Sequence, residues 1–63
     1  MPTDLDTQAA RRWARSVPAK ELEANIVMLR DRPDEMVPIV FADGWRHEVP
    51  AMLIVRVAAD ILA

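Results

Sequence analysis

Hydrophobic residues recur at helical spacing in three segments of the chain, and a run of β-branched and aromatic residues separates the second segment from the third. The pattern predicts helices over about residues 5–16, 18–30 and 51–62 and a β-hairpin over about residues 37–49. The predicted order is helix, helix, hairpin, helix. We therefore expect one small domain of the α+β class.

The first predicted helix is amphipathic, and its polar face is basic. Asp4 or Asp6 can cap its start, because a short side-chain oxygen accepts from the free N–H groups of the opening turn. Ser16 precedes Pro18, so the first helix should end there and Ser16 should cap the second. The apolar side consists of Leu5, Ala9, Ala10, Trp13, Ala14 and Val17, and the polar side of Gln8, Arg11, Arg12 and Arg15.

The second predicted helix carries apolar residues on two sides. The core stripe consists of Ala19, Leu22, Ile26 and Leu29, and a patch on nearly the opposite side of Ala24, Val27 and Met28. Only one side can face the core of the domain. The other side needs a second neighbour, so Val27 and Met28 are candidates for self-association.

The third predicted helix is apolar over more than half of its circumference, with Arg56 and Asp60 as its only charged strip. A helix this apolar must be enclosed, and a chain of 63 residues has little material to enclose it. We therefore expect part of the cover to come from a second copy or another protein. The residues expected at this contact are Ile54, Val57, Ile61 and Leu62.

The dipeptide Asp43-Gly44 predicts the tip of the hairpin, because a two-residue type I′ turn needs positive φ at both central positions. A loop of this length would place Val40 opposite His47. Pro38 cannot donate to a strand ladder, so the first strand should begin or lie at an edge of the sheet.

Residues 34–42 admit a second interpretation, a short helix in place of the first strand. Pro33 would start this helix, but Pro38 would strain it. The turn sequence favours the hairpin, and the alternative stays open at this point.

Candidates for catalysis are few. Ser16 is the only serine and His47 the only histidine, and the chain has no cysteine or tyrosine. His47 could serve as a metal ligand or proton acceptor with Glu48 or Asp43, but neighbouring strand residues face opposite sides. A single glycine excludes a glycine-rich phosphate loop. We therefore expect no enzyme, no cofactor and no metal site.

The charge of the chain indicates no general attraction to polyanions. Its formal net charge is −2 at pH 7, and the start of the chain lacks the basic and apolar regions of a signal peptide. The longest apolar run, residues 51–55, is far too short to span a bilayer. We expect a cytoplasmic protein without a membrane partner.

The expected function is reached by elimination. We expect a small regulatory or interaction protein that forms a homodimer through apolar helix faces and binds a larger protein partner. Trp45 is a candidate contact residue, because it follows the turn and tryptophan is enriched at binding hot spots. The alternative is a dimeric DNA-binding regulator that grips phosphates through Arg11, Arg12 and Arg15, although the acidic balance of the chain disfavours it.

Overall fold

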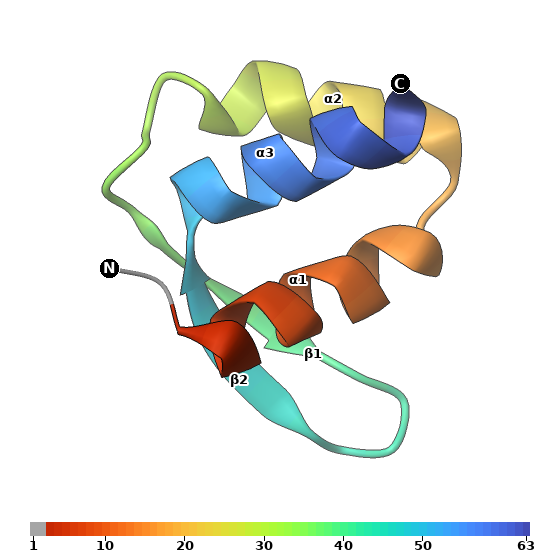
Figure 1. Cartoon of the computed structure of the whole chain (residues 1–63), viewed down its shortest axis with the longest axis vertical. Helices are drawn as coiled ribbons and strands as arrows, with labels where there is room; N and C mark the ends of the chain where they lie inside the picture. Colours follow the sequence, from red (N-terminus) through yellow and green to blue (C-terminus); the bar gives the residue numbers. More distant parts are fainter. Residues whose placement is uncertain (1–2) are drawn as a thin grey trace.

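The computed structural model describes residues 3–63 and has the predicted order of elements. The bounds are Asp4–Arg15 for α1, Ala19–Leu29 for α2, Met36–Val40 for β1, Arg46–Pro50 for β2 and Ala51–Leu62 for α3 (Figure 1). The α+β class is confirmed. The alternative helix over residues 34–42 is wrong, because residues 36–40 pair with β2 as an antiparallel strand.

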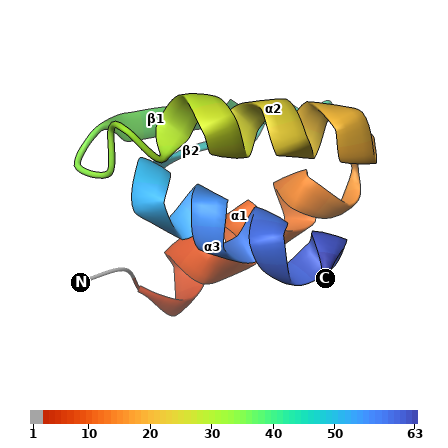
Figure 2. The same ribbon diagram turned by 90° about the horizontal axis from the view of Figure 1, so that it is seen from above.

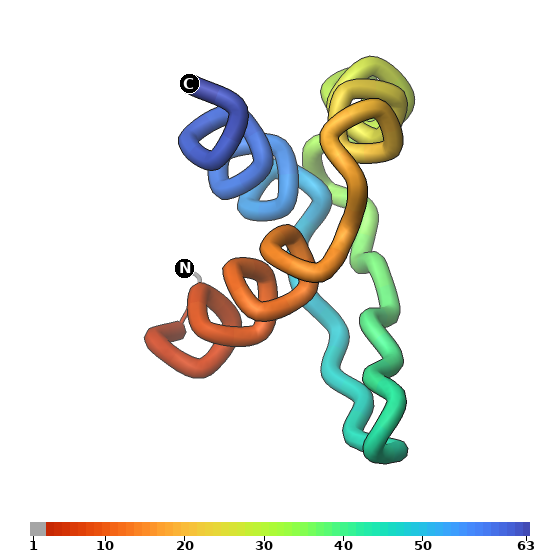
Figure 3. The backbone as a smooth tube through the Cα atoms, turned by 90° about the vertical axis from the view of Figure 1, so that its right-hand side faces the viewer, coloured from red at the N-terminus to blue at the C-terminus, as the bar shows by residue number. Residues whose placement is uncertain are grey.

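The elements form two layers. Figures 2 and 3 show α1 and α3 in one layer and α2 with the hairpin in the other. The last helix, α3, contacts α1, α2 and β2, so it lies at the centre of the packing. The inner face of the hairpin is covered by α1 and by the start of α3.

The core encloses most of the apolar surface of α3 within the chain itself. Its largest fully buried side chains are Leu22, Val49 and Ile54, one each from α2, β2 and α3. Small residues of α1 complete the core, since Ala9, Ala10 and Ala14 let the helix backbone approach α3 closely. Neighbouring elements of the same chain therefore supply cover for α3 that we expected from a second chain.

The caps of α1 differ from the prediction. Its N-cap is Thr3, whose hydroxyl oxygen accepts from the Asp6 N–H at 3.1 Å while the Asp6 carboxylate accepts from the Thr3 N–H at 3.0 Å. This reciprocal pair is a capping box. Ser16 ends α1 instead of starting α2, and its hydroxyl donates to the Trp13 carbonyl at 2.8 Å. The N-cap of α2 is Pro18, which forms no side-chain hydrogen bond.

The tip of the hairpin is one residue longer than predicted. The Phe41 N–H donates to the Trp45 carbonyl at 2.8 Å, and the Gly44 N–H donates to the Phe41 carbonyl at 2.9 Å. The loop therefore has three residues and ends at Gly44, whose φ is +88°. The extra residue moves the register by one, so that Val40 lies opposite Arg46 and not opposite His47.

Candidate binding surface on α1 and the hairpin

The basic side of α1 forms a shallow concave surface. A concavity of about 560 Å³ is lined by Gln8, Arg11, Arg12, Arg15 and Ser16. These residues lie on one side of the helix, because helix positions three and four apart are neighbours. The three predicted arginines therefore face solvent together, and we call this set of five residues the basic face.

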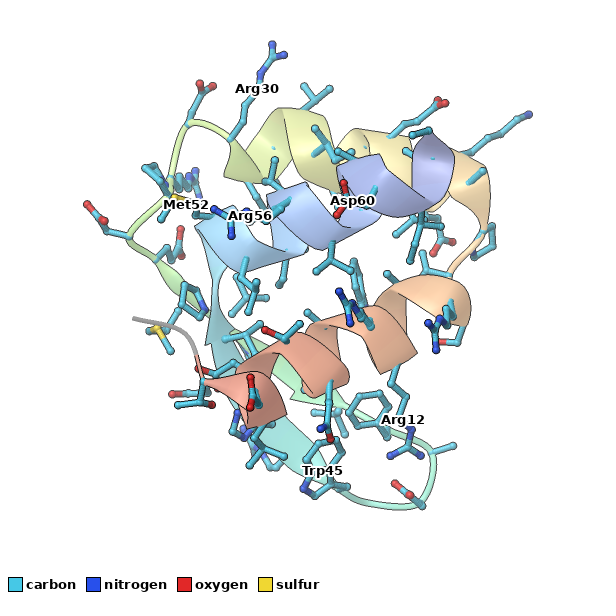
Figure 4. All side chains as sticks on the ribbon, viewed as in Figure 1. Arg12, Arg30, Trp45, Met52, Arg56 and Asp60 are labelled. Atoms are coloured by element: carbon cyan, nitrogen blue, oxygen red, sulfur yellow. The ribbon has the colours of Figure 1, made fainter. Side chains whose placement is uncertain are left out.

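Arg12 is held in place by the tip of the hairpin. Its Nη2 lies 2.9 Å from Oδ2 of Asp43, and its guanidinium carbon lies 4.1 Å from the centre of the Phe41 ring (Figure 4). Asp43 also accepts from the Trp45 N–H at 3.1 Å. The hydrogen bond from Arg12, followed by that from Trp45, lowers the pKa of Asp43 below its ordinary value. One arginine of the basic face is therefore held in a fixed position.

Arg11 and Arg15 are exposed on the same face, and within residues 3–63 neither has an ion-pair partner. Among the described residues, Arg12 is the only arginine of α1 with a carboxylate partner. Both guanidinium groups therefore keep all their donors for solvent or a ligand.

Aromatic rings form a stack on the side of the hairpin that faces α1. The ring centres of Phe41 and Trp45 are 5.0 Å apart with an interplanar angle of 14°, and those of Trp45 and His47 are 5.8 Å apart at 16°. Trp45 is half-buried in this stack and does not stand free as an anchor. Because strand residues alternate between faces, the sequence alone places Trp45 and His47 on the same face. Phe41 joins them only because the loop has three residues, which sets Phe41 opposite Trp45.

The far end of the stack is tied to the start of α1. Nε2 of His47 lies 2.5 Å from Oδ1 of Asp6. The pKa of Asp6 is lowered, chiefly by the hydrogen bond from the Thr3 N–H and then by that from His47. The sequence indicates only a capping role for Asp6, because nothing in its pattern links this residue to His47, 41 positions away.

The hypothesis that His47 works with Glu48 or Asp43 receives no support from their positions. Glu48 lies on the outer face of β2, while His47 faces α1 and Asp43 binds Arg12. Among the residues that the structure describes, no group of three or more His, Cys, Asp or Glu residues is placed to hold a metal ion. The contact of His47 with Asp6 fastens the stack, and with it the hairpin, to α1.

The residues predicted for self-association lie in two different environments. Val27 and Met28 are exposed on α2, each with 57% of its surface accessible, and Ile61 is exposed near the end of α3. Leu62 is half-buried against the core, and Ile54 and Val57 are inside it. The structure does not bring the six residues together on one surface, and their role in self-association stays a prediction.

In the part of the chain that the structure describes, no helix is both long enough and apolar enough to cross a membrane. Comparisons with protein families, with curated proteins and with solved structures found no match to this chain.

Proposed function

We propose that this chain is a small non-enzymatic binding protein that recognises an acidic segment of a larger protein through the basic face of α1. The observation that carries the proposal is that the guanidinium groups of Arg11 and Arg15 have no ion-pair partner among residues 3–63 and lie beside a fixed third one, Arg12. Arginine matches a carboxylate with two parallel N–H donors, which gives both direction and strength.

The fixed position of Arg12 favours binding. Its side chain is already ordered by Phe41 and Asp43, so less side-chain entropy is lost when a ligand arrives. Gln8 and Ser16 add neutral hydrogen-bonding groups to the same concavity. A segment with carboxylates spaced along a turn or strand could therefore meet several donors at once.

The charge around the basic face favours a short acidic segment over a nucleic acid. The three arginines are offset locally by Asp43, and the chain as a whole carries a net charge of −2. Duplex DNA is usually held by many phosphate contacts, and its affinity rests on a broad basic surface. A compact patch with one internal carboxylate suits a few carboxylates better than a continuous polyanion.

The test compares two probes on the same protein. A fluorescein-labelled oligoglutamate peptide and a fluorescein-labelled DNA duplex are titrated with the chain, and fluorescence anisotropy is read at low and at physiological salt. The double variant Arg11→Ala/Arg15→Ala removes the two free arginines. The double variant Arg30→Ala/Arg56→Ala is the matched control, because it makes the same change in net charge at two exposed positions, the C-cap of α2 and the outer side of α3 (Figure 4).

We expect the peptide to bind and the first variant to weaken its binding by about tenfold or less, as two surface ion pairs predict. The control variant should bind like the original chain. Equal losses in both variants would reject a specific site on α1. A duplex that binds more tightly than the peptide, with the same dependence on Arg11 and Arg15, would replace the proposal with the DNA-binding alternative.

A further inference from the structure

The two open edges of the hairpin differ in their ability to pair with another strand. The sheet has two strands, so each strand has one neighbour and one free edge. Hydrogen-bonded and non-hydrogen-bonded pairs alternate along an antiparallel ladder. Phe41 donates to Trp45, so the two nearest non-hydrogen-bonded pairs are Val40 with Arg46 and Pro38 with Glu48. The backbone groups of these residues point away from the partner strand.

The free edge of β1 is interrupted at its middle. Pro38 has no N–H, and it occupies the centre of the edge between Met36 and Val40. The free edge of β2 presents complete backbone groups at Arg46 and Glu48. In the described chain, neither residue forms a backbone hydrogen bond outside the ladder, and both are exposed. Only β2 therefore offers an intact edge for strand addition.

We propose that two copies of the chain pair through β2, antiparallel, with the two-fold axis at His47. Arg46 then lies opposite the partner's Glu48, and each N–H donates to the carbonyl across the interface. Directly opposite residues lie on the same face of a sheet, so the Arg46 and Glu48 side chains also meet across the interface with opposite charge. The outer face of β2 is thus complementary to itself.

The charges select this register over its neighbours. An axis at Glu48 would place two glutamates opposite each other and set Arg46 against Pro50, which has no N–H. An axis at Arg46 would oppose two arginines. Like charges directly opposite destabilise a strand pair, so only the axis at His47 combines backbone pairing with attraction.

The dimer would convert a marginal hairpin into a four-stranded sheet. Two strands alone are marginally stable, and three or more with a covered face are the usual minimum. Edge pairing about a two-fold axis keeps both inner faces on the same side, so the α1 helices of both copies would lie on that side. The interface contains none of the arginines of the basic face, and it stands or falls independently of the proposed function.

The decisive experiment uses charge-reversal variants. Two copies of the same variant should repel each other across the interface, whereas the two different variants should attract each other. Arg46→Glu gives a chain with two acidic residues on the β2 edge, and Glu48→Arg gives a chain with two basic ones. Each variant alone should dimerise about tenfold more weakly than the original chain by sedimentation velocity over a concentration series. Mixed in equal amounts, the two variants should form a heterodimer, because every opposed pair then has opposite charge.

A matched control separates the register from general charge attraction. Arg56→Glu and Asp60→Arg make the same two charge changes on the exposed side of α3 (Figure 4). These variants should keep the dimerisation of the original chain, separately and when mixed. The control mixture should contain homodimers and heterodimers in random proportion, whereas the β2 mixture should contain mainly heterodimers. The same preference for the heterodimer in both mixtures would overturn the proposal.

Backbone pairing is tested by chemical synthesis of the chain with an N-methyl group at one residue. N-methylation of Glu48 removes the edge donor without touching the internal ladder, and it should abolish the dimer. N-methylation of Val40, at the free edge of β1, should leave it intact. Circular dichroism checks that both chains fold. A chain that is monomeric at every concentration, or a dimer lost with Val27→Asp and insensitive to both β2 changes, would overturn the proposal.

Discussion

The guanidinium of Arg12 lies 2.9 Å from the carboxylate of Asp43, so an ion pair joins the second half of α1 to the tip of the hairpin. The two residues are 31 positions apart in the chain. The same guanidinium lies over the ring of Phe41. These contacts therefore join α1 to the hairpin on their exposed side, outside the apolar core.

Replacing Arg12 should destabilise the fold, whereas replacing its neighbour should not. We expect Arg12→Ala to lower the free energy of unfolding by about 1 kcal/mol, chiefly through the lost cation–π contact with Phe41, because an exposed ion pair adds little. The measurement is urea unfolding followed by tryptophan fluorescence. Arg11→Ala is the control and should change stability by less than about 0.5 kcal/mol. Equal losses in the two variants would show that Arg12 does not fasten the hairpin.

The length of the turn shows where prediction from the sequence stops. The residues Asp43 and Gly44 predict the position of the tip correctly, because a positive φ in a tight turn favours glycine. They do not settle whether the loop has two or three residues. The extra residue shifts the pairing of the two strands by one position, so Val40 lies opposite Arg46 and not opposite His47. The element bounds were predicted within about two residues, since they follow from periodicity and proline positions.

The candidate site was only partly predictable from the sequence. Helical spacing alone gathers Arg11, Arg12 and Arg15 on one face, because that grouping is local. The partner of Arg12 and the partner of His47 depend on how the hairpin lies on α1, which is a tertiary property. How much of the apolar surface of α3 is covered by α1 and α2 is likewise a tertiary property that the sequence does not reveal.

The fold should lose stability in acid because two carboxylates have lowered pKa values. Asp6 and Asp43 hold their protons less tightly in the folded chain than in the unfolded one, so the unfolded chain binds more protons as the pH falls. Their contribution is therefore complete at neutral pH and is lost as the pH falls below about 4. Unfolding by urea at several pH values measures this fall.

The variant Asp6→Asn should be less stable than the original chain at neutral pH and should lose less stability in acid. The control variant Asp60→Asn changes an exposed position on α3 and should keep the original dependence of stability on pH. A slope unchanged by Asp6→Asn would contradict the assignment.

Substitution of Gly44 should lower the stability of the fold, and the cause lies in its backbone conformation alone. Its φ of +88° is strained for any residue with a Cβ, yet an added Cβ would meet no atom within 4 Å. We expect Gly44→Ala to cost about 1–2 kcal/mol through backbone strain alone. Gly44→Asn should cost less, because asparagine tolerates this region better. Thermal or urea unfolding of both variants gives the comparison, and an alanine variant as stable as the asparagine one would show that the loop relaxes to another turn.

Two isoleucines of α3 should respond very differently to the loss of one methylene group. Ile54 is 1% exposed within the core, whereas Ile61 is 40% exposed near the end of the helix. Ile54→Val should therefore lower the free energy of unfolding by about 0.5–1.5 kcal/mol, because the removed group leaves a space that the packed core fills only partly. Ile61→Val should have little effect on a single chain. Urea unfolding at low and at high protein concentration separates the two possible roles of Ile61. A loss of stability in Ile61→Val that grows with protein concentration would place Ile61 in an interface between copies, and no dependence on concentration would leave α3 as a helix covered by its own chain.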